Sequence, residues 1–216
     1  PHMDPKSEFV TRFAPSPTGY LHLGHAFSAL TAFEAARAAE GRFLLRIEDI
    51  DEGRRRPEFE AAIFEDLEWL GLSWEAPVRR QSDHLADYQA VLDRLIGMGV
   101  VYRDFRTRKE IAAESAGAPH GNPDIVRNAY ALTPAREAEM LRENKPFAWR
   151  LWLDEARTRL GADWYELSFE ADGVREKANP LLLGDAILAR KDVPTSYHLA
   201  SVHDDAQQGV TDVIRG

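Results

Sequence analysis

Two histidines lie close together near the start of the chain, in the stretch TRFAPSPTGYLHLGH from Thr11 to His25. His22 and His25 are three residues apart, so on a helix their imidazoles face the same side. Free N–H groups at a helix start attract anions, and Gly24 would let a phosphate approach the backbone. The pair could therefore donate hydrogen bonds to a nucleotide α-phosphate as charge develops on it. Two ordinary surface or core histidines are the alternative interpretation.

The histidines would lie where a strand gives way to a helix. Phe9 to Ala14 is aromatic and β-branched and is closed by Pro15, which predicts a buried strand. Residues 23–40 are rich in alanine and predict a helix that ends before Gly41. The face expected to be buried carries the larger apolar residues of this helix, namely Leu23, Phe27, Leu30 and Phe33.

The elements that follow indicate a parallel sheet. A second strand is predicted over Arg42 to Asp49, followed by helices over residues 57–70 and 83–98 and a strand near Val101. This order of strands and helices is typical of an α/β, Rossmann-like half domain. Ligands of such sheets bind at the carboxyl ends of the strands, where the two histidines would lie. The apolar stripes of the two helices are Phe59, Ile63, Leu67 and Leu70, and Leu85, Tyr88, Leu92 and Leu95.

The pattern changes after residue 101, because residues 102–130 are polar and lack periodicity. Beyond this stretch the sequence predicts a helix from Pro134 to Glu143 capped by Thr133, a strand in FAWRLWLD, and a strand, helix and strand in DAILARKD, YHLASVHDDA and GVTDVIRG. We therefore expect a parallel-sheet domain split into residues 8–101 and 190–216, with an α+β insertion over residues 102–189.

Composition and charge narrow the class of protein. The chain has 216 residues, of which 44% are hydrophobic and 29% charged, with no cysteine and a formal net charge of −9. This composition excludes disulfides and thiolate metal sites and fits a reducing cytoplasm. No apolar run approaches the ~18 residues of a membrane span, no signal peptide is recognised, and Pro1 to Met3 is expected to be a cloning remnant. The negative charge argues against a general nucleic-acid binder, although clusters such as Arg54–Arg56 could form a local basic stripe.

The segment from Pro15 to His25, PSPTGYLHLGH, resembles the H-I-G-H signature region of the class I aminoacyl-tRNA synthetases. RFAPSPTG, LLRIEDID and SYHLASVHDDAQQGVTDVIRG are similar, in this order, to motifs of the glutamyl branch of that class. The resemblance spans Thr11 to Gly216, with gaps in the insertion. It implies a Rossmann-type catalytic domain in which ATP and glutamate condense to glutamyl-adenylate, after which glutamate passes to RNA.

The resemblance also assigns site residues. His22 and His25 would be catalytic, in an ATP-binding region made of Pro15, Gly19, His22, Leu23, Gly24 and His25. The glutamate pocket would be lined by Arg12, Phe13, Ala14, Pro15, Ser16, Glu48, Tyr197 and Arg215. These types suit the ligand, because Arg12 and Arg215 can pair with carboxylates and Glu48 with an ammonium group. Alternatively, Glu48, Asp49 and Asp51 could together hold Mg²⁺.

Details within the glutamyl branch favour a short form that lacks the anticodon-binding domain. Ile50 in RIEDID stands where full-length enzymes usually have threonine, and HLGHAFSAL replaces the common H-x-G-G-A-R-T-A-L. The resemblance then implies that a monomer uses ATP, with Mg²⁺ as counter-ion, to attach L-glutamate to queuosine in the tRNA(Asp) anticodon, with no membrane partner. Two alternatives stay open: the truncated catalytic domain of an ordinary glutamyl-tRNA synthetase, and a non-catalytic nucleotide- or RNA-binding relic. The chain ends at Gly216, ahead of the family's K-M-S-K-S-like loop, so we do not expect full activity from it as it stands.

A zinc site that many short relatives carry in the insertion is not expected here. Their motif C-x-C follows a tyrosine, whereas this chain has Asp104 and Arg106 after Tyr102, and arginine is not a metal ligand. We expect an ion pair between Asp104 and Arg106 instead, with His120 isolated. An apolar cluster of Phe105, Tyr130, Trp149 and Trp152 would replace the metal, and the loop from Glu114 to Asp124 would be mobile.

Overall fold

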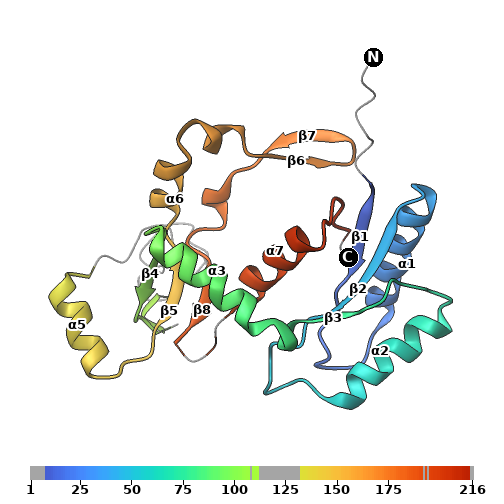
Figure 1. The fold of residues 1–216 in the computed structure, drawn as a ribbon, viewed down its shortest axis with the longest axis horizontal. Coiled ribbons are helices and arrows are strands. Elements are labelled where there is room, and N and C mark those ends of the chain that lie inside the picture. The colour runs from blue at the N-terminus through green and yellow to red at the C-terminus, as the bar shows by residue number, and fades with distance from the viewer. Residues whose placement is uncertain (1–7, 108, 112–131, 192, 194, 215–216) are drawn as a thin grey trace. The chain divides into compact units, whose positions relative to one another are not determined.

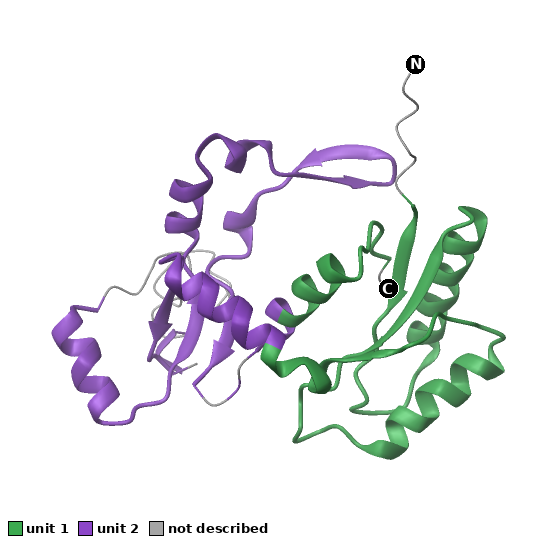
Figure 2. Ribbon diagram, viewed as in Figure 1, with its two compact units in different colours: residues 1–86, 200–216 green, residues 87–199 purple. Residues whose placement is uncertain are grey.

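The structure is a computed structural model that describes residues 8–107, 109–111, 132–191, 193 and 195–214. The chain forms two compact units (Figures 1 and 2): unit 1 comprises residues 1–86 and 200–216, and unit 2 comprises residues 87–199. The domain boundaries predicted at residues 101–102 and 189–190 both fall within unit 2. The predicted mobile loop, Tyr130, His120 and Arg215 lie outside the described residues.

Unit 1 is built on a parallel three-stranded sheet with the order β1–β2–β3. Strand β1 (Val10–Phe13) runs beside β2 (Arg42–Ile47), with Arg12 opposite Leu44. The end of β2 pairs with β3 (Arg79–Arg80), a strand that the sequence did not predict because two arginines carry no strand pattern. The predicted parallel sheet is thus confirmed, but its third strand is not the one expected near Val101.

The two faces of this sheet carry different side chains, because successive residues of a strand point to opposite sides. Phe43, Leu45 and Ile47 face the apolar core together with helices α1 (Leu23–Ala38) and α2 (Pro57–Trp69). Arg46, between two of these residues, is fully buried on the other face. Residues 200–214 cover that face and include most of α7 (Tyr197–Gln207; Figure 1). One face of the sheet therefore forms the core and the other a buried polar layer.

Helix α1 contacts the sheet through small residues. Its buried residues are Ala29, Ala32 and Ala36, whereas Leu23 is 86% exposed and Phe27 67% exposed. The predicted buried face was therefore wrong for Leu23 and Phe27, although Leu30 and Phe33 pack against the core in part. The alanine face of α1 packs on the sheet because its small side chains let the helix backbone approach closely. The sheet surface there is already filled by phenylalanine and leucine side chains.

The other predicted helices of the first hundred residues form as expected. Helix α2 begins at Pro57 and buries Ile63 and Leu67. A 3₁₀ turn (Gln81–His84) leads into α3 (Leu85–Gly97), which buries Tyr88 and Leu92. Among the described residues, no helix is both long and apolar enough to cross a membrane.

Unit 2 contains an antiparallel sheet with the order β4–β5–β8, formed by Val101–Asp104, Ala148–Leu151 and Ile187–Arg190. The strand predicted near Val101 therefore exists, but it belongs to this sheet. Helix α5 (Pro134–Arg142) is capped by Thr133 Oγ1 as predicted. Helix α6 (Leu153–Leu160), the 3₁₀ segments (Gly161–Glu166 and Pro180–Leu182) and the hairpin of β6 (Ser168–Ala171) and β7 (Val174–Lys177) were not predicted. The hairpin does carry a turn signal, since Asp172 and Gly173 both have positive φ.

The segment after α7 was predicted to be a strand, and its described residues do not form one. The backbone N–H groups of Thr211 and Asp212 both donate to the carbonyl oxygen of Val10, and Val10 N donates to Thr211 Oγ1 at 2.8 Å. Two backbone N–H groups that donate to the same carbonyl oxygen do not form the repeating hydrogen-bond pattern of paired β-strands. This contact nevertheless attaches the segment to the start of β1.

Candidate active site

The two histidines lie at the first turn of α1, immediately after the loop that leaves β1. His22 is the N-cap residue, and its Nδ1 accepts a hydrogen bond from Gly24 N at 3.1 Å. His25 Nδ1 accepts from His22 N at 3.2 Å, so the two side chains complete a reciprocal cap. The rings stack with their centroids 3.8 Å apart. The predicted helix start and the shared orientation of the two imidazoles are therefore both present.

This arrangement determines where each neutral imidazole carries its proton. Because both Nδ1 atoms accept hydrogen bonds from the backbone, a neutral ring must carry its hydrogen on Nε2. Burial and the nearby His22 lower the pKa of His25, which favours its neutral form. The helix start thus presents Nε2–H donors, which can bind an anionic oxygen.

A buried charge network occupies the polar face of the sheet. The Arg12 guanidinium contacts Asp205 through Nε and Nη2, at 3.0 and 3.1 Å. Arg46 donates from Nη1 to Asp205 at 2.7 Å and from Nη2 to Glu48 Oε1 at 3.1 Å. A third arginine, Arg79, contacts Asp204 at 2.8 Å. Two of the predicted pocket residues, Arg12 and Glu48, are therefore connected through Asp205 and Arg46.

Sequence reasoning missed Arg46, Asp204 and Asp205. The available signal was charge within predicted elements: Arg46 interrupts an apolar strand and the two aspartates interrupt the helix of YHLASVHDDA. Burying a charged side chain is costly unless it is paired, so a strand arginine predicts a buried acid nearby. Burial raises the pKa of Glu48, while the charges of Arg46 and Arg12 oppose this shift.

The remaining predicted pocket residues are placed as follows. Phe13 and Pro15 are buried at the end of β1, and the Pro15 carbonyl accepts from Glu48 N at 2.9 Å, which holds the two strand ends together. Ala14 lies between them, whereas Ser16, Gly19 and Leu23 follow in the loop and the first turn of α1. Tyr197 begins α7 and belongs to unit 2.

The acidic cluster after β2 is not arranged to hold a cation. Asp49 accepts hydrogen bonds from Ser82 N and Oγ and from Arg55, at 2.8, 2.6 and 3.1 Å. Asp51 pairs with Arg54 at 2.7 Å, and Glu48 is held by Arg46. Within the described part of the chain no group of three histidine or acidic side chains could hold a metal. The alternative of a Mg²⁺ site at Glu48, Asp49 and Asp51 therefore does not fit the residues present.

The basic clusters of the sequence largely pair with acids rather than form an open stripe. Arg55 contacts Asp49 and Arg79 contacts Asp204. The other pairs are Arg54 with Asp51, Arg80 with Glu60, Arg103 with Glu137 and Arg106 with Asp104.

In unit 2, the ion pair predicted between Asp104 and Arg106 is confirmed. Arg106 donates to both carboxylate oxygens from Nε and Nη2, at 2.9 and 3.0 Å, and Arg150 donates from the neighbouring strand at 2.7 Å. Burial alone would raise the pKa of Asp104, but its bonds to Arg106 and the charge of Arg150 outweigh this effect and lower it. The two guanidiniums surround the carboxylate where a cation would have to bind.

The aromatic cluster of unit 2 differs in part from the prediction. Phe147 joins Phe105 and Trp149, with ring centroids 5.3 and 5.7 Å away. Trp152 instead contacts Tyr102, at 6.0 Å. Phe147 was missed because its position at the start of FAWRLWLD was attributed to the strand alone.

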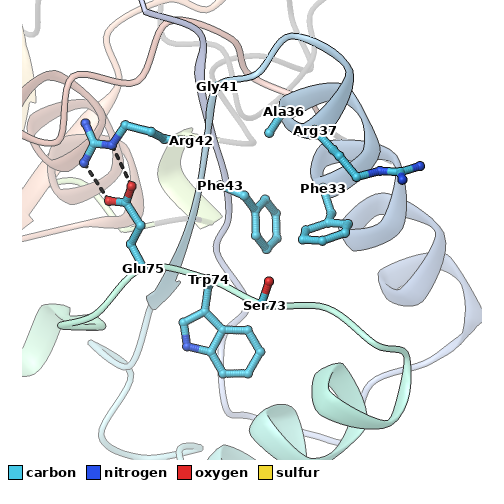
Figure 3. A pocket seen from close by; sticks show the side chains of 9 residues that line it. All are labelled: Phe33, Ala36, Arg37, Gly41, Arg42, Phe43, Ser73, Trp74 and Glu75. Atoms are coloured by element: carbon cyan, nitrogen blue, oxygen red, sulfur yellow. Dashed lines mark hydrogen bonds and ion pairs between the residues drawn. The ribbon is translucent and has the colours of Figure 1, made fainter.

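A cavity of about 350 Å³ in unit 1 is lined by residues of α1, the start of β2 and residues 73–75 (Figure 3). It is at the amino end of β2, next to Gly41 and Arg42, whereas Glu48 follows the carboxyl end of the same strand. Its lining includes Phe33, Phe43 and Trp74, with Arg42 paired to Glu75 at its rim. Because ligands of parallel sheets bind at the carboxyl ends, this cavity is not the candidate site.

Unit 1 combines a parallel sheet, a helix start with two imidazoles, and an arginine and a glutamate at the ends of adjacent strands, a set that suits an enzyme that joins a nucleotide and an amino acid. A family model for the catalytic domain of class I tRNA synthetases (E and Q) matches residues 8–216. The chain belongs to this family, whose members are ligases. Its relatives include the glutamyl-Q tRNA(Asp) synthetase of Rhodobacter capsulatus, which is 45% identical over 96% of this chain and 76% of that protein.

Other relatives are longer. Glutamate–tRNA ligase 1 of Ruegeria pomeroyi is 39% identical over 96% of this chain and 45% of its own length. The crystal structure of a glutamate tRNA ligase from Elizabethkingia meningosepticum, in complex with its amino acid, matches 97% of this chain and 44% of that one, with a TM-score of 0.72 and 29% identity. This chain thus spans less than half the length of these two ligases.

Proposed function

We propose that this protein activates L-glutamate with ATP to form glutamyl-adenylate and transfers the glutamate to queuosine in the anticodon of tRNA(Asp). The observation that carries the amino-acid part is the placement of Arg12 and Glu48 at the ends of adjacent strands, linked through Asp205 and Arg46. The RNA part is supported by the identity to the protein of Rhodobacter capsulatus, whose name states this acceptor.

In this proposal the amino acid binds between the two strand ends. The Arg12 guanidinium binds a carboxylate of glutamate, and Glu48 binds the ammonium group through Oε2, the oxygen that Arg46 leaves unused. The family resemblance assigns Arg215 and Tyr197 to glutamate binding as well, and Ser16 would add a hydroxyl donor. The site is selective because a ligand that lacks either charge would lose one of these charge-assisted interactions.

Activation joins a carboxylate oxygen of glutamate to the α-phosphorus of ATP, and pyrophosphate leaves. Negative charge develops on the α-phosphate oxygens, where His22 and His25 would donate from Nε2. Their stacked rings are already held by backbone bonds, so little reorganisation is needed during the reaction. A nucleophile of the modified base then attacks the adenylate carbonyl, and AMP leaves. Mg²⁺ would enter with ATP as counter-ion of its phosphates.

A second candidate function is that of an ordinary glutamate–tRNA ligase catalytic domain. It is favoured by relatives of that name, such as the protein of Aquifex aeolicus, which is 37% identical over 97% of this chain. The two functions differ in their RNA acceptor and, as the resemblance implies, in whether activation requires tRNA.

The test is glutamate-dependent exchange between ATP and pyrophosphate, first without RNA. We expect exchange without tRNA, followed by transfer of labelled glutamate to tRNA(Asp) that contains queuosine and none to tRNA(Asp) that lacks it. Exchange that requires tRNA(Glu), with transfer to its acceptor end, would support the second function. The absence of both exchange and glutamate binding would support a non-catalytic relic.

A further inference from the structure

Asp205 occupies a central position on the polar face of the sheet. One of its carboxylate oxygens, Oδ1, accepts from both Arg12 Nε and Arg46 Nη1, and Oδ2 accepts from Arg12 Nη2. Its side chain is 20% exposed, whereas those of Arg12 and Arg46 are 7% and 0% exposed. A single carboxylate therefore fixes two arginines that come from adjacent strands.

The bonds to Arg12 leave part of its guanidinium available. Asp205 binds the edge made of Nε and Nη2, and within the described residues Nη1 has no acceptor. A guanidinium is planar and has a second edge, formed by Nη1 and Nη2, that can also bind a carboxylate with two hydrogen bonds. Asp205 thus orients Arg12 without taking the edge that a ligand would use.

The second arm of the network reaches Glu48. Arg46 donates from Nη1 to Asp205 and to Gln208, at 2.7 and 3.1 Å, and from Nη2 to Glu48 Oε1. With both ends of its guanidinium held, Arg46 has little freedom to rotate, and Glu48 is held in turn. Arg12 and Glu48, the two side chains that we assign to ligand binding, are therefore both oriented by the carboxylate of Asp205.

From this geometry we propose that Asp205 is the positioning residue of the amino-acid site: it holds Arg12 directly and Glu48 through Arg46 in the orientation that binds glutamate. This inference rests on the proposed function, because it takes glutamate as the ligand of Arg12 and Glu48. Asp205 itself does not touch the ligand in this scheme.

The negative charge of Asp205 also acts on the protonation of Glu48. Burial is the main cause of the raised pKa of Glu48, and the negative charge of Asp205 adds to it. Removing that charge therefore favours the ionised form of Glu48, the form that binds an ammonium group. Weaker glutamate binding after this change would result from lost orientation and not from protonation of Glu48.

The test measures glutamate binding by calorimetry for the unaltered chain and for Asp205→Asn. Loss of one charge-assisted pair should weaken glutamate binding about 10- to 100-fold. Asp205→Glu provides a second variant, because it keeps the charge that the two arginines need but moves the carboxylate by one methylene. This variant should fold, but its affinity for glutamate should be lower than that of the unaltered chain.

Asp185→Asn is the control. Asp185 is a buried aspartate of unit 2, outside the network of Arg12, Arg46 and Asp205, and it accepts hydrogen bonds from Tyr102 Oη and Leu153 N at 3.1 and 3.0 Å. Its substitution should lower the melting temperature and leave the affinity for glutamate within about twofold. A general loss of stability would instead weaken binding in both variants.

A double-mutant cycle with Arg12→Gln tests whether Asp205 acts through Arg12. The variant with both substitutions should lose less affinity than the sum of the two single losses, because the Arg12 arm is already absent and only the Glu48 arm, through Arg46, can still respond. Additive losses, or unchanged affinity in Asp205→Asn, would overturn the role of Asp205. No glutamate binding by the unaltered chain would contradict the proposed function itself.

Discussion

At the scale of single residues, the candidate site depends on protonation states that neighbouring groups impose. His22 and His25 both use Nδ1 for the helix cap, so each can donate only from Nε2 when neutral. Glu48 must be ionised to bind an ammonium group, although burial raises its pKa. The Nε2–H donor of His25 and the ionisation of Glu48 can each be tested by a substitution.

Replacing His25 by Asn should slow adenylate formation about 10²- to 10³-fold, because the side chain keeps an acceptor for the cap but loses the Nε2–H donor. The affinity for glutamate should stay within about twofold, since the lost donor acts only on charge that develops during the reaction. Single-turnover exchange kinetics measure the first quantity and calorimetry the second. Glu34→Gln, on the exposed side of the same helix, is the control, and equal rates in both variants would remove the histidine from the mechanism.

Glutamate binding should weaken as the pH falls, and this loss should begin at a higher pH than for an ordinary glutamate side chain. Burial raises the pKa of Glu48 above 4.5, so its protonated form becomes populated earlier as the solution is acidified. Calorimetric titrations at several pH values measure this dependence. Glu48→Gln should bind weakly throughout and lack the dependence; parallel pH profiles of the two proteins would show that another group titrates.

At the scale of elements, α1 illustrates what the sequence could and could not predict. Its start, end and length follow from His22, the alanine-rich stretch and Gly41. The choice of its buried face does not follow, because large apolar residues on one side compete with alanines on the other. The distance between α1 and the sheet determines which face of the helix is buried. That distance depends on residues of another element, such as Phe43.

Replacing Ala32 by Leu should lower the free energy of unfolding by about 1–3 kcal/mol, because the site is 1% exposed and filled by the sheet. Phe27→Ala, which changes the same helix at an exposed position, should change it by less than about 0.5 kcal/mol. Urea unfolding followed by circular dichroism measures both. If the two effects were reversed, the phenylalanine face would be the buried one.

The ion pairs between β4, β5 and the loop after β4 give a second prediction for an element. Asp104→Asn should cost about 3–5 kcal/mol, because it leaves Arg106 and Arg150 buried without their carboxylate. Asp154→Asn removes an exposed pair with Arg157 and should cost about 0–1 kcal/mol. Urea unfolding compares the variants, and similar losses for both would show that the buried pairs contribute no more than a surface pair.

At the scale of the whole molecule, elements that depend on local signals were predicted best. Strand β2, helix α2 and the Thr133 cap follow from apolar spacing, Pro57 and a hydroxyl before a proline. The charge network was not predicted, because it joins residues from both ends of the sequence. Proximity of this kind depends on topology, which spacing along the chain does not encode.

The protein should keep its stability without zinc, since Asp104 is enclosed by Arg106 and Arg150 and the chain has no cysteine. Elemental analysis of the purified protein should find far less than one zinc per chain. Thermal melts with and without a chelator should coincide. Stoichiometric zinc, or a melting temperature lowered by the chelator, would contradict this prediction.

The bond between Arg12 and Asp205 joins residues 193 positions apart, and that between Arg46 and Asp205 joins residues 159 positions apart. During synthesis on the ribosome, both arginines therefore emerge long before the helix that neutralises them. An unpaired guanidinium is too costly to bury, so this face of the nascent sheet stays hydrated while the intervening residues are translated. Closing so long a loop also has an entropic cost, which is recovered only when Asp205 arrives. The polar face is thus completed only after the whole of unit 2 has left the ribosome.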